Sequence, residues 1–381
     1  MTFKSKLPAV GTTIFSQMSQ LAAQQQAINL SQGFPDFAPD SLLLQYLSDY
    51  SQQGLNQYAP MPGIAPLCEQ IAALVQRCYG RIICAGQQVT VTSGATEALF
   101  VAISAVVMPG DEVIVFDPAY DSYAPAIQLN GGAAVHIALN APDYRINWQQ
   151  VAEAITPRTK LIIVNSPHNP TGMVFNKADW LALQQLVLAH NLYCVSDEVY
   201  EHMVFDGIPQ LSANNFADLA QRSFIISSFG KTFHVTGWKL GYCVAPEALT
   251  AEFRKIHQYV TFSSFTPAQH AIAGMLQHQS QQVSGLAAFY QHKRDQFASL
   301  LQGSRLQLLP CQGTYFQLAD YSAVSELDDV AFCRWLTIEH KVAAIPLSVF
   351  YNQPSQRRIV RFCFAKQSST LEAAAEVLCR I

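Results

Sequence analysis

Charged residues are scarce in this sequence. Only 13% of the 381 residues are Asp, Glu, Lys or Arg, and the formal net charge is −4. No basic stripe or arginine run is present, which argues against nucleic acid or another polyanion as a partner. No apolar run reaches the roughly 18 residues that a membrane-spanning helix needs. We therefore expect neither a nucleic-acid partner nor a membrane partner.

Metal-binding cysteine spacing and an export signal are also missing. The nine cysteines are scattered, and no two of them form a Cys-x-x-Cys pair. The first residues, Met-Thr-Phe-Lys-Ser-Lys-Leu-Pro, lack the apolar core of a signal peptide. We expect reduced thiols in the cytoplasm, most of them filling the core, and no metal site.

Hydrophobic residues make up 50% of the chain, which is enough for a large core. In the middle of the chain, short β-branched runs alternate with helical stretches such as 96–107, 148–154 and 177–190. This alternation predicts an α/β fold with a mostly parallel seven-stranded sheet between helices. The expected strands are 88–92, 112–116, 134–139, 161–165, 193–196, 224–228 and 241–245.

The pattern changes from about residue 275 onward. A long helical stretch through Phe289 and Phe297 leads into short strands around 313–318 and 358–364, which indicates a smaller α+β domain. The irregular N-terminal segment is expected to pack on it. The predicted division is a large domain, 46–275, and a small domain formed by 1–45 and 276–381.

Small residues follow the first predicted strand of the sheet. In Ser-Gly-Ala-Thr-Glu-Ala-Leu, residues 93–99, Ala95 and Thr96 open a helix. Backbone N–H groups can approach a phosphate there, and the helix dipole favours an anion. The alternative is an ordinary strand-to-helix turn with Thr96 near the N-cap.

A lysine follows the strand at 224–228. Lys231 lies in Ser-Ser-Phe-Gly-Lys-Thr, among aromatic and glycine residues that can depress its pKa and make it a nucleophile. Ser228 and Lys239 add a hydroxyl and a cation, which both suit a phosphate. A surface lysine whose stem packs on apolar residues is the alternative.

A carboxylate ends the very apolar strand at 193–196. Asp197 is costly there without a cationic partner, and a protonated pyridine nitrogen is such a partner. Tyr200 could then reach the adjacent ring oxygen. The alternative is that Asp197 caps a following helix.

Further polar and aromatic side chains follow other strands. Tyr120 could stack on a flat heterocycle or pack at the sheet edge. Asn169, in a turn-rich loop, could donate to a phenolic oxygen or a carboxylate, whereas its neighbour His168 is interpreted as a loop residue without a catalytic role. Arg361 alternates with apolar residues on a late strand, which indicates either bidentate binding of a carboxylate or a structural ion pair.

Taken in order, these motifs resemble the fold-type-I, pyridoxal-phosphate-dependent aminotransferases of class I/II. Within that family they are most similar to the branch of kynurenine aminotransferase/glutamine transaminase K and bacterial methionine aminotransferase. The resemblance runs from Asn-Leu-Ser-Gln-Gly-Phe-Pro-Asp-Phe, residues 29–37, to Val-Arg-Phe-Cys-Phe, residues 360–364. It implies pyridoxal 5'-phosphate as the cofactor.

The resemblance also implies the role of each residue. Lys231 holds the cofactor as a Schiff base and later moves the substrate proton, and Asp197 keeps the pyridine nitrogen protonated. Asn169 and Tyr200 contact the ring oxygen, and Tyr120 stacks on the ring. The implied phosphate site consists of Ala95, Thr96, Ser228 and Lys239. Many relatives have Arg at the position of Lys239.

A homodimer follows from the same resemblance, because Tyr58 matches a tyrosine that reaches the phosphate of the neighbouring subunit. The substrate α-carboxylate is expected on Gly33, Asn169 and Arg361. The side-chain pocket is expected to be lined by Phe15, Tyr58, Tyr123 and Phe262.

The sequence places no second arginine for a dicarboxylic substrate. We therefore expect ping-pong transfer of the amino group of a neutral bulky or thioether amino acid to a 2-oxo acid. Candidate donors are methionine, aromatic amino acids, kynurenine and glutamine.

A carbon–sulfur β-lyase acting on cystathionine or cysteine S-conjugates is the rival enzyme. A regulatory protein that senses the cofactor is disfavoured, because the motif at 29–37 begins too early for an N-terminal DNA-binding domain.

Overall fold

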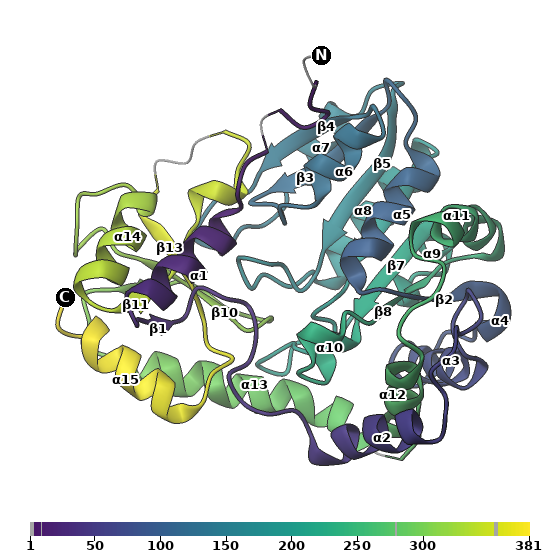
Figure 1. The fold of residues 1–381 in the computed structure, drawn as a ribbon. Helices are drawn as coiled ribbons and strands as arrows, with labels where there is room; N and C mark the ends of the chain where they lie inside the picture. Colours follow the sequence, from purple (N-terminus) through teal and green to yellow (C-terminus); the bar gives the residue numbers. More distant parts are fainter. Residues whose placement is uncertain (1–3, 9, 279, 354–356) are drawn as a thin grey trace.

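The computed structural model describes residues 4–8, 10–278, 280–353 and 357–381 (Figure 1). Its large sheet has seven strands in the order β2-β8-β7-β6-β5-β3-β4, which confirms the predicted α/β fold. Among these described strands, β8 alone runs in the opposite direction to the other six. The strands are β2 (Val89–Thr92), β3 (Glu112–Asp117), β4 (Ala133–Ala138), β5 (Thr159–Asn165), β6 (Tyr193–Asp197), β7 (Ser223–Ser228) and β8 (Gly241–Val244).

Helices cover both faces of this sheet, so its central strands are apolar on both sides. Val113 and Val115 of β3 pack into one core, and Ile114 and Phe116 pack into the other. The first core includes side chains of α5 (Ala95–Val106), α6 (Tyr123–Leu129) and α11 (Glu247–Val260). The second includes side chains of α3 (Ala65–Tyr79), α7 (Trp148–Ala154) and α8 (Lys177–Ala189).

A smaller sheet lies beside the large one, at the left of Figure 1. Its four strands are ordered β12-β13-β10-β9, and α13 (Ser280–Leu300), α14 (Asp329–Glu339) and α15 (Ser368–Leu378) accompany it. This confirms the smaller α+β part that the sequence predicted. The strands are β9 (Gln307–Leu308), β10 (Phe316–Asp320), β12 (Ile345–Pro346) and β13 (Ile359–Cys363).

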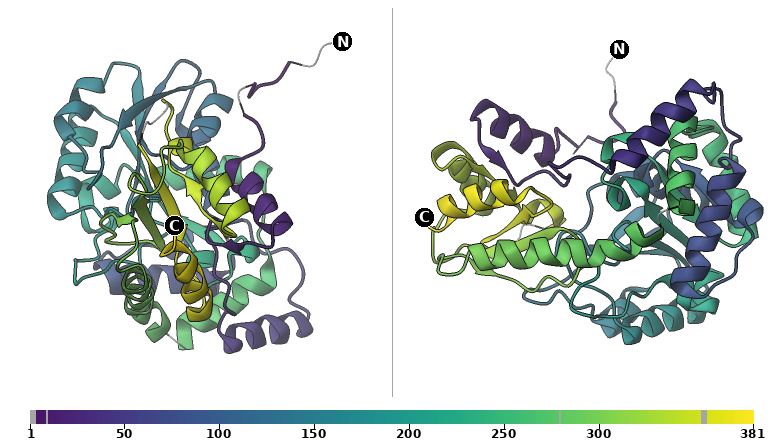
Figure 2. Two further views of the ribbon diagram at one scale, coloured as in Figure 1. Left: turned by 90° about the vertical axis from the view of Figure 1, so that its left-hand side faces the viewer. Right: turned by 90° about the horizontal axis from the view of Figure 1, so that it is seen from below.

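The N-terminal segment packs on this smaller part. Strand β1 (Ile28–Asn29) pairs in parallel with β11 (Val342–Ala343), and α1 (Ile14–Gln24) lies beside α14 (Figures 1 and 2). Residues from the two ends of the chain therefore form one structural unit.

The predicted division at residues 45 and 275 falls inside two helices, α2 (Ser41–Gln52) and α12 (Thr266–His278). These helices pack closely on each other, since a Cβ at Gly274 would lie 3.2 Å from the Tyr46 ring. We propose that the boundaries lie before α2 and after α12, because a helix folds as one unit.

One close backbone contact joins the large sheet to the start of α5. A Cβ at Gly241 would lie 2.7 Å from the Ser227 carbonyl oxygen and 2.9 Å from the Ala95 nitrogen. Both contacts are backbone atoms, so neither can move away by changing a rotamer. Only glycine fits between β7 and the first turn of α5.

We predict that Gly241→Ala destabilises the protein by about 1–3 kcal/mol, because it overpacks this contact. The midpoint of thermal unfolding should fall by about 2 °C or more. Gly86→Ala is the matched control, because a Cβ there would meet no described atom within 4 Å. Equal midpoints for the two variants would contradict the proposed tight packing.

Candidate active site

A cavity of about 300 Å³ opens at the edge of the large sheet. The strands β3, β5, β6 and β7 end at this edge, and the antiparallel β8 begins there, as expected for an open α/β sheet. The structure brings twelve of the predicted site residues together around the cavity: Phe15, Gly33, Ala95, Thr96, Tyr120, Asn169, Asp197, Tyr200, Ser228, Lys231, Lys239 and Arg361.

Lys231 lies on the single turn α10 (Phe229–Thr232), directly after β7. Its Nζ donates a hydrogen bond to Tyr315 Oη at 2.8 Å and a longer one to the Gly33 carbonyl at 3.3 Å. Burial lowers the pKa of this amine to about 8. Lys231 therefore lines the cavity with an amine whose pKa is lowered, and the surface-lysine alternative is wrong.

Asp197 ends β6 and is 3% exposed. Its carboxylate accepts hydrogen bonds from Tyr123 Oη at 2.6 Å and from the Val199 N–H at 3.3 Å. Burial raises the pKa of Asp197 to about 6, so the charged form would gain from a nearby cation. In the described structure, turns rather than a helix follow Asp197, so the capping alternative is wrong.

Tyr123 lies elsewhere than predicted. It was expected in the wall of the side-chain pocket, but it is buried at the start of α6, behind Asp197, and is not among the described residues that line the cavity. Its hydroxyl donates to Asp197 instead. The reason is physical: the Asp197 oxygen is buried and must be hydrogen-bonded, and Tyr123 supplies the donor.

The start of α5 forms an anion cradle. Its N-cap is Gly94, with φ of 79°, and no side-chain cap is present in the described structure. The first N–H groups of α5 are therefore open to a ligand. A Cβ at Gly94 would lie 3.3 Å from Lys239 Nζ, so the cation stands directly at this cradle. Ser228 adds a hydroxyl to the lining, and the group suits a phosphate.

Arg361 lies on β13 and is 1% exposed. One amino group donates to Asn169 Oδ1 at 2.7 Å and the other to the Ser31 carbonyl at 3.2 Å. The guanidinium lies over the Phe316 ring, 3.8 Å from its centre. Burial lowers the pKa of Arg361 to about 10.

None of the ion pairs found among the described residues includes Arg361, and its Nε has no hydrogen-bond partner there. The structural ion pair is therefore not the reason for this buried cation. An arginine without a carboxylate partner suits a carboxylate ligand. Because Asn169 Oδ1 accepts from Arg361, the Asn169 amide N–H groups remain available as donors.

Aromatic rings and one glycine shape the rest of the cavity. Tyr120 Oη lies 3.5 Å from Thr96 Oγ1, which holds its ring at the cavity. Phe15, on α1, packs edge-on against Phe350. Gly33 allows the N-terminal segment to approach closely, since a Cβ there would lie 2.8 Å from the Phe316 ring.

Tyr58 and Phe262 lie outside the described cavity lining. Their rings meet edge to face at 5.4 Å on the surface, and Tyr58 is 84% exposed. The contact of Tyr58 with a neighbouring subunit stays a prediction.

The sequence reasoning missed several residues of the site. Tyr315 donates to the Gly33 carbonyl at 2.5 Å and accepts from Lys231, and Phe316, Asn165 and Asp121 line the cavity. Asn165 ends β5 and could have been found by its place at a strand end. Tyr315 precedes the short β10, where the sequence carries no comparable signal.

Two features are absent from the part of the chain that the structure describes. It contains no helix with the length and apolar character to cross a membrane. It also contains no cluster of three or more His, Cys, Asp or Glu side chains arranged to hold a metal ion.

Comparisons with known proteins identify the family of this chain. Residues 25–378 match the family model "Aminotransferase class I and II". The chain is 55% identical to methionine aminotransferase of Escherichia coli K12, covering 98% of this chain and 97% of the relative. It is 32% identical to kynurenine–oxoglutarate transaminase 1 of Mus musculus, covering 98% and 96%.

Solved structures give the same result. A crystal structure from Escherichia coli, for which a methionine aminotransferase function was identified, superposes with a TM-score of 0.98, at 54% identity and 100% coverage of both chains. Aspartate aminotransferase of Thermus thermophilus with maleate superposes with a TM-score of 0.91, at 29% identity and 100% coverage of both chains. The fold, the residues of the cavity and these similarities together place the chain in the class I and II aminotransferase family.

Proposed function

We propose that this protein uses pyridoxal 5'-phosphate to move the amino group of a neutral bulky or thioether amino acid, methionine first, to a 2-oxo acid. The single observation that carries the substrate class is the number of cations at the cavity. Among the described residues that line it, the lysines and arginines are Lys231, Lys239 and Arg361. In this scheme Lys231 reacts with the cofactor, Lys239 binds its phosphate and Arg361 binds the substrate α-carboxylate. No cation among them remains to bind a second substrate carboxylate.

The residues present fit the cofactor. The first N–H groups of α5, Ser228 and Lys239 would hold its phosphate, and the buried Asp197 would pair with its ring nitrogen. Tyr120 would pack on the ring face, and Asn169 and Tyr200 would reach the ring oxygen. When bound, the cofactor supplies a carbonyl for the amino group and an electron-withdrawing ring that stabilises charge at the substrate Cα.

The chain's own residues then bind substrate and move a proton. Arg361 and the Asn169 amide would hold the α-carboxylate, which would bring the substrate Cα–H bond within reach of Lys231 Nζ. Lys231, with its lowered pKa, takes up the proton and gives it back. An amino acid and a 2-oxo acid both carry a carboxylate next to the reacting carbon. Arg361 can bind either in turn, which predicts ping-pong kinetics.

The apolar part of the cavity favours an uncharged side chain. Phe15 and Phe316 line it, and the one carboxylate at the cavity besides Asp197, among the described residues, is Asp121. A negative group near the substrate would repel a second carboxylate. The relative that shares 55% identity is named for methionine, which supports the same substrate.

We further propose a homodimer in the cytoplasm. The 84% exposed Tyr58 and its neighbour Phe262 form an aromatic surface that a second subunit would cover, as the family pattern implies. All nine cysteines are unpaired, which suits a reducing compartment.

Replacing Lys231 by Ala should lower the transamination rate by about 10⁴-fold or more, because the site loses both its nucleophile and its base. The measurement is the rate of 2-oxo acid formation from methionine at saturating pyridoxal phosphate. Lys255→Ala, which removes an exposed lysine paired with Glu252, is the control and should leave the rate unchanged. A near-normal rate in Lys231→Ala would contradict the proposal.

Amino-donor profiling with one fixed 2-oxo acid should rank methionine and phenylalanine above aspartate by about tenfold or more in kcat/KM. The physical reason is the missing cation for a second carboxylate. Aspartate as the best donor would refute the proposed substrate class. Pyruvate and ammonia released from cystathionine with no 2-oxo acid supplied would favour the β-lyase instead.

The reaction of Lys231 with pyridoxal phosphate should depend on pH. The neutral amine is the nucleophile, and burial lowers its pKa to about 8. The rate should therefore be low below this pH, rise as the pH passes through about 8, and level off above it. Absorbance changes on mixing the cofactor-free protein with pyridoxal phosphate measure the rate. A midpoint near that of an ordinary solvated lysine, roughly two units higher, would contradict the lowered pKa.

A further inference from the structure

Tyr315 meets Lys231, a residue that lines the cavity, through its hydroxyl. Tyr315 Oη lies 2.8 Å from Lys231 Nζ and 2.5 Å from the Gly33 carbonyl oxygen. Lys231 Nζ also lies 3.3 Å from the same carbonyl. The three groups form a closed triangle, and they come from the large sheet, the smaller part and the N-terminal segment.

Counting protons in this triangle determines the direction of each hydrogen bond. The Gly33 carbonyl can only accept, and a tyrosine hydroxyl has one proton to give. Tyr315 therefore donates its proton to Gly33, and its oxygen meets Lys231 as an acceptor. Both acceptors lie on the same side of Lys231 Nζ, since they are only 2.5 Å from each other. The amine is thereby tied to Tyr315 and Gly33 beside the cavity that Lys231 lines.

We propose that Tyr315 is a positioning residue for Lys231: its hydroxyl accepts from the ε-amine and holds the amine in place at the wall of the cavity. This inference rests on the proposed role of Lys231 as nucleophile and proton carrier. Tyr315 acts through Lys231 and needs no contact with the substrate.

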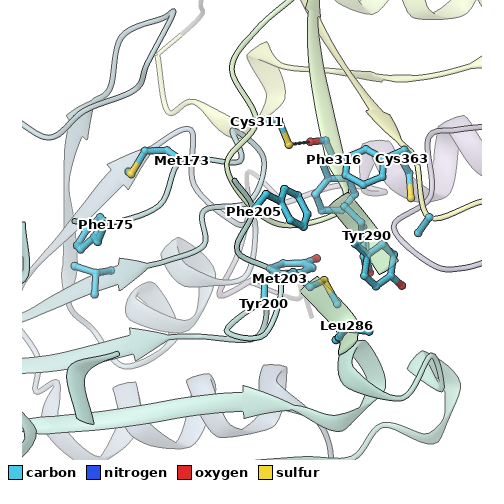
Figure 3. Close-up of a cluster of buried hydrophobic side chains, with 14 of the residues drawn as sticks. Met173, Phe175, Tyr200, Met203, Phe205, Leu286, Tyr290, Cys311, Phe316 and Cys363 are labelled. Carbon is cyan, nitrogen blue, oxygen red and sulfur yellow. Dashed lines mark hydrogen bonds between the residues drawn. The ribbon is translucent and has the colours of Figure 1, made fainter. Parts of the chain in front are cut away.

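The surroundings hold the Tyr315 ring in one place. It is completely buried, and it meets the rings of Tyr200, Tyr290 and Phe316 at 5.2, 5.6 and 4.8 Å. Figure 3 shows Tyr200 of the large part facing Tyr290 and Phe316 of the smaller part in this apolar cluster. A ring packed on several sides cannot turn its hydroxyl away from Lys231.

Tyr315 keeps its proton over the working pH range, since burial raises its pKa well above the ordinary value. The hydroxyl therefore stays a donor to Gly33 and an acceptor from Lys231 at all relevant pH. The titratable and charged groups that face Lys231 are Asp197, Tyr200, Lys239, Tyr315, Arg361 and Cys363.

The test compares Tyr315→Phe with Tyr290→Phe. Both changes remove one buried hydroxyl and keep the ring. Tyr290 is the matched control, because its hydroxyl has no hydrogen-bond partner among the described residues and its ring touches that of Tyr315.

The full-length, cofactor-free protein is mixed with pyridoxal phosphate at a series of pH values. The Lys231 amine condenses with the aldehyde and water leaves, and borohydride then supplies the hydride that fixes the adduct for mass spectrometry. A second readout is kcat and KM for methionine in the holoenzyme.

In Tyr315→Phe, we expect the capture rate at high pH to fall about tenfold, the effect of one well-formed hydrogen bond. The midpoint of the pH profile should move down, because the lost acceptor stabilised the protonated amine. The kcat should fall while KM stays near the wild-type value. Tyr290→Phe should match wild type in all three readouts.

The inference is overturned if both variants keep the wild-type capture rate and pH midpoint. It is also overturned if both variants lose capture rate and kcat to the same extent. If Tyr315→Phe does not fold, 3-fluorotyrosine at position 315 keeps the shape and weakens the oxygen as an acceptor, and an unchanged midpoint would then overturn it. A wild-type protein whose Lys231 is never captured refutes the proposed function itself. A captured wild type with an unaffected Tyr315→Phe refutes only the role of Tyr315.

Discussion

The parallel strands of the large sheet end at one common edge, and the cavity depends on this constraint. Helices cover both faces of the strands, so the backbone leaves the buried apolar core at this edge. Backbone N–H groups at the start of α5 remain open there, and the loops after β3, β5, β6 and β7 carry the polar side chains. The polar groups of the site therefore gather at the ends of the strands, and the packing of the sheet determines where these ends lie.

Desolvation gives the charges at this edge their chemical character. It lowers the pKa values of Lys231 and Arg361 and raises that of Asp197. All three shifts oppose the charged form, so each group is stabilised by a ligand of opposite charge or a hydrogen-bond partner. A ligand pair with a cationic ring and a carboxylate would neutralise Asp197 and Arg361. The pKa of Lys231, lowered to about 8, increases the share of its neutral, nucleophilic form near neutral pH.

The smaller part of the molecule completes the cavity from the other side. Arg361 comes from β13, and Tyr315 precedes β10 in the same small sheet. The N-terminal segment joins them through two carbonyl groups, since Ser31 accepts from Arg361 and Gly33 accepts from Tyr315. The substrate-binding half of the site is thus assembled from segments far apart in the chain. Its residues reach this arrangement only when the large and the smaller part pack together.

The amino-acid sequence by itself determined the strands of the large sheet and the residues that follow them. Lys231, Asp197 and Asn169 each come just after an apolar, β-branched run, and that signal is local. Tyr123 and Tyr315 carry no such signal. Their hydrogen bonds to Asp197 and Gly33 join residues 74 and 282 positions apart. Only the tertiary structure decided which hydroxyl meets which buried group, because such contacts depend on how distant segments pack and not on the order of residues along a strand.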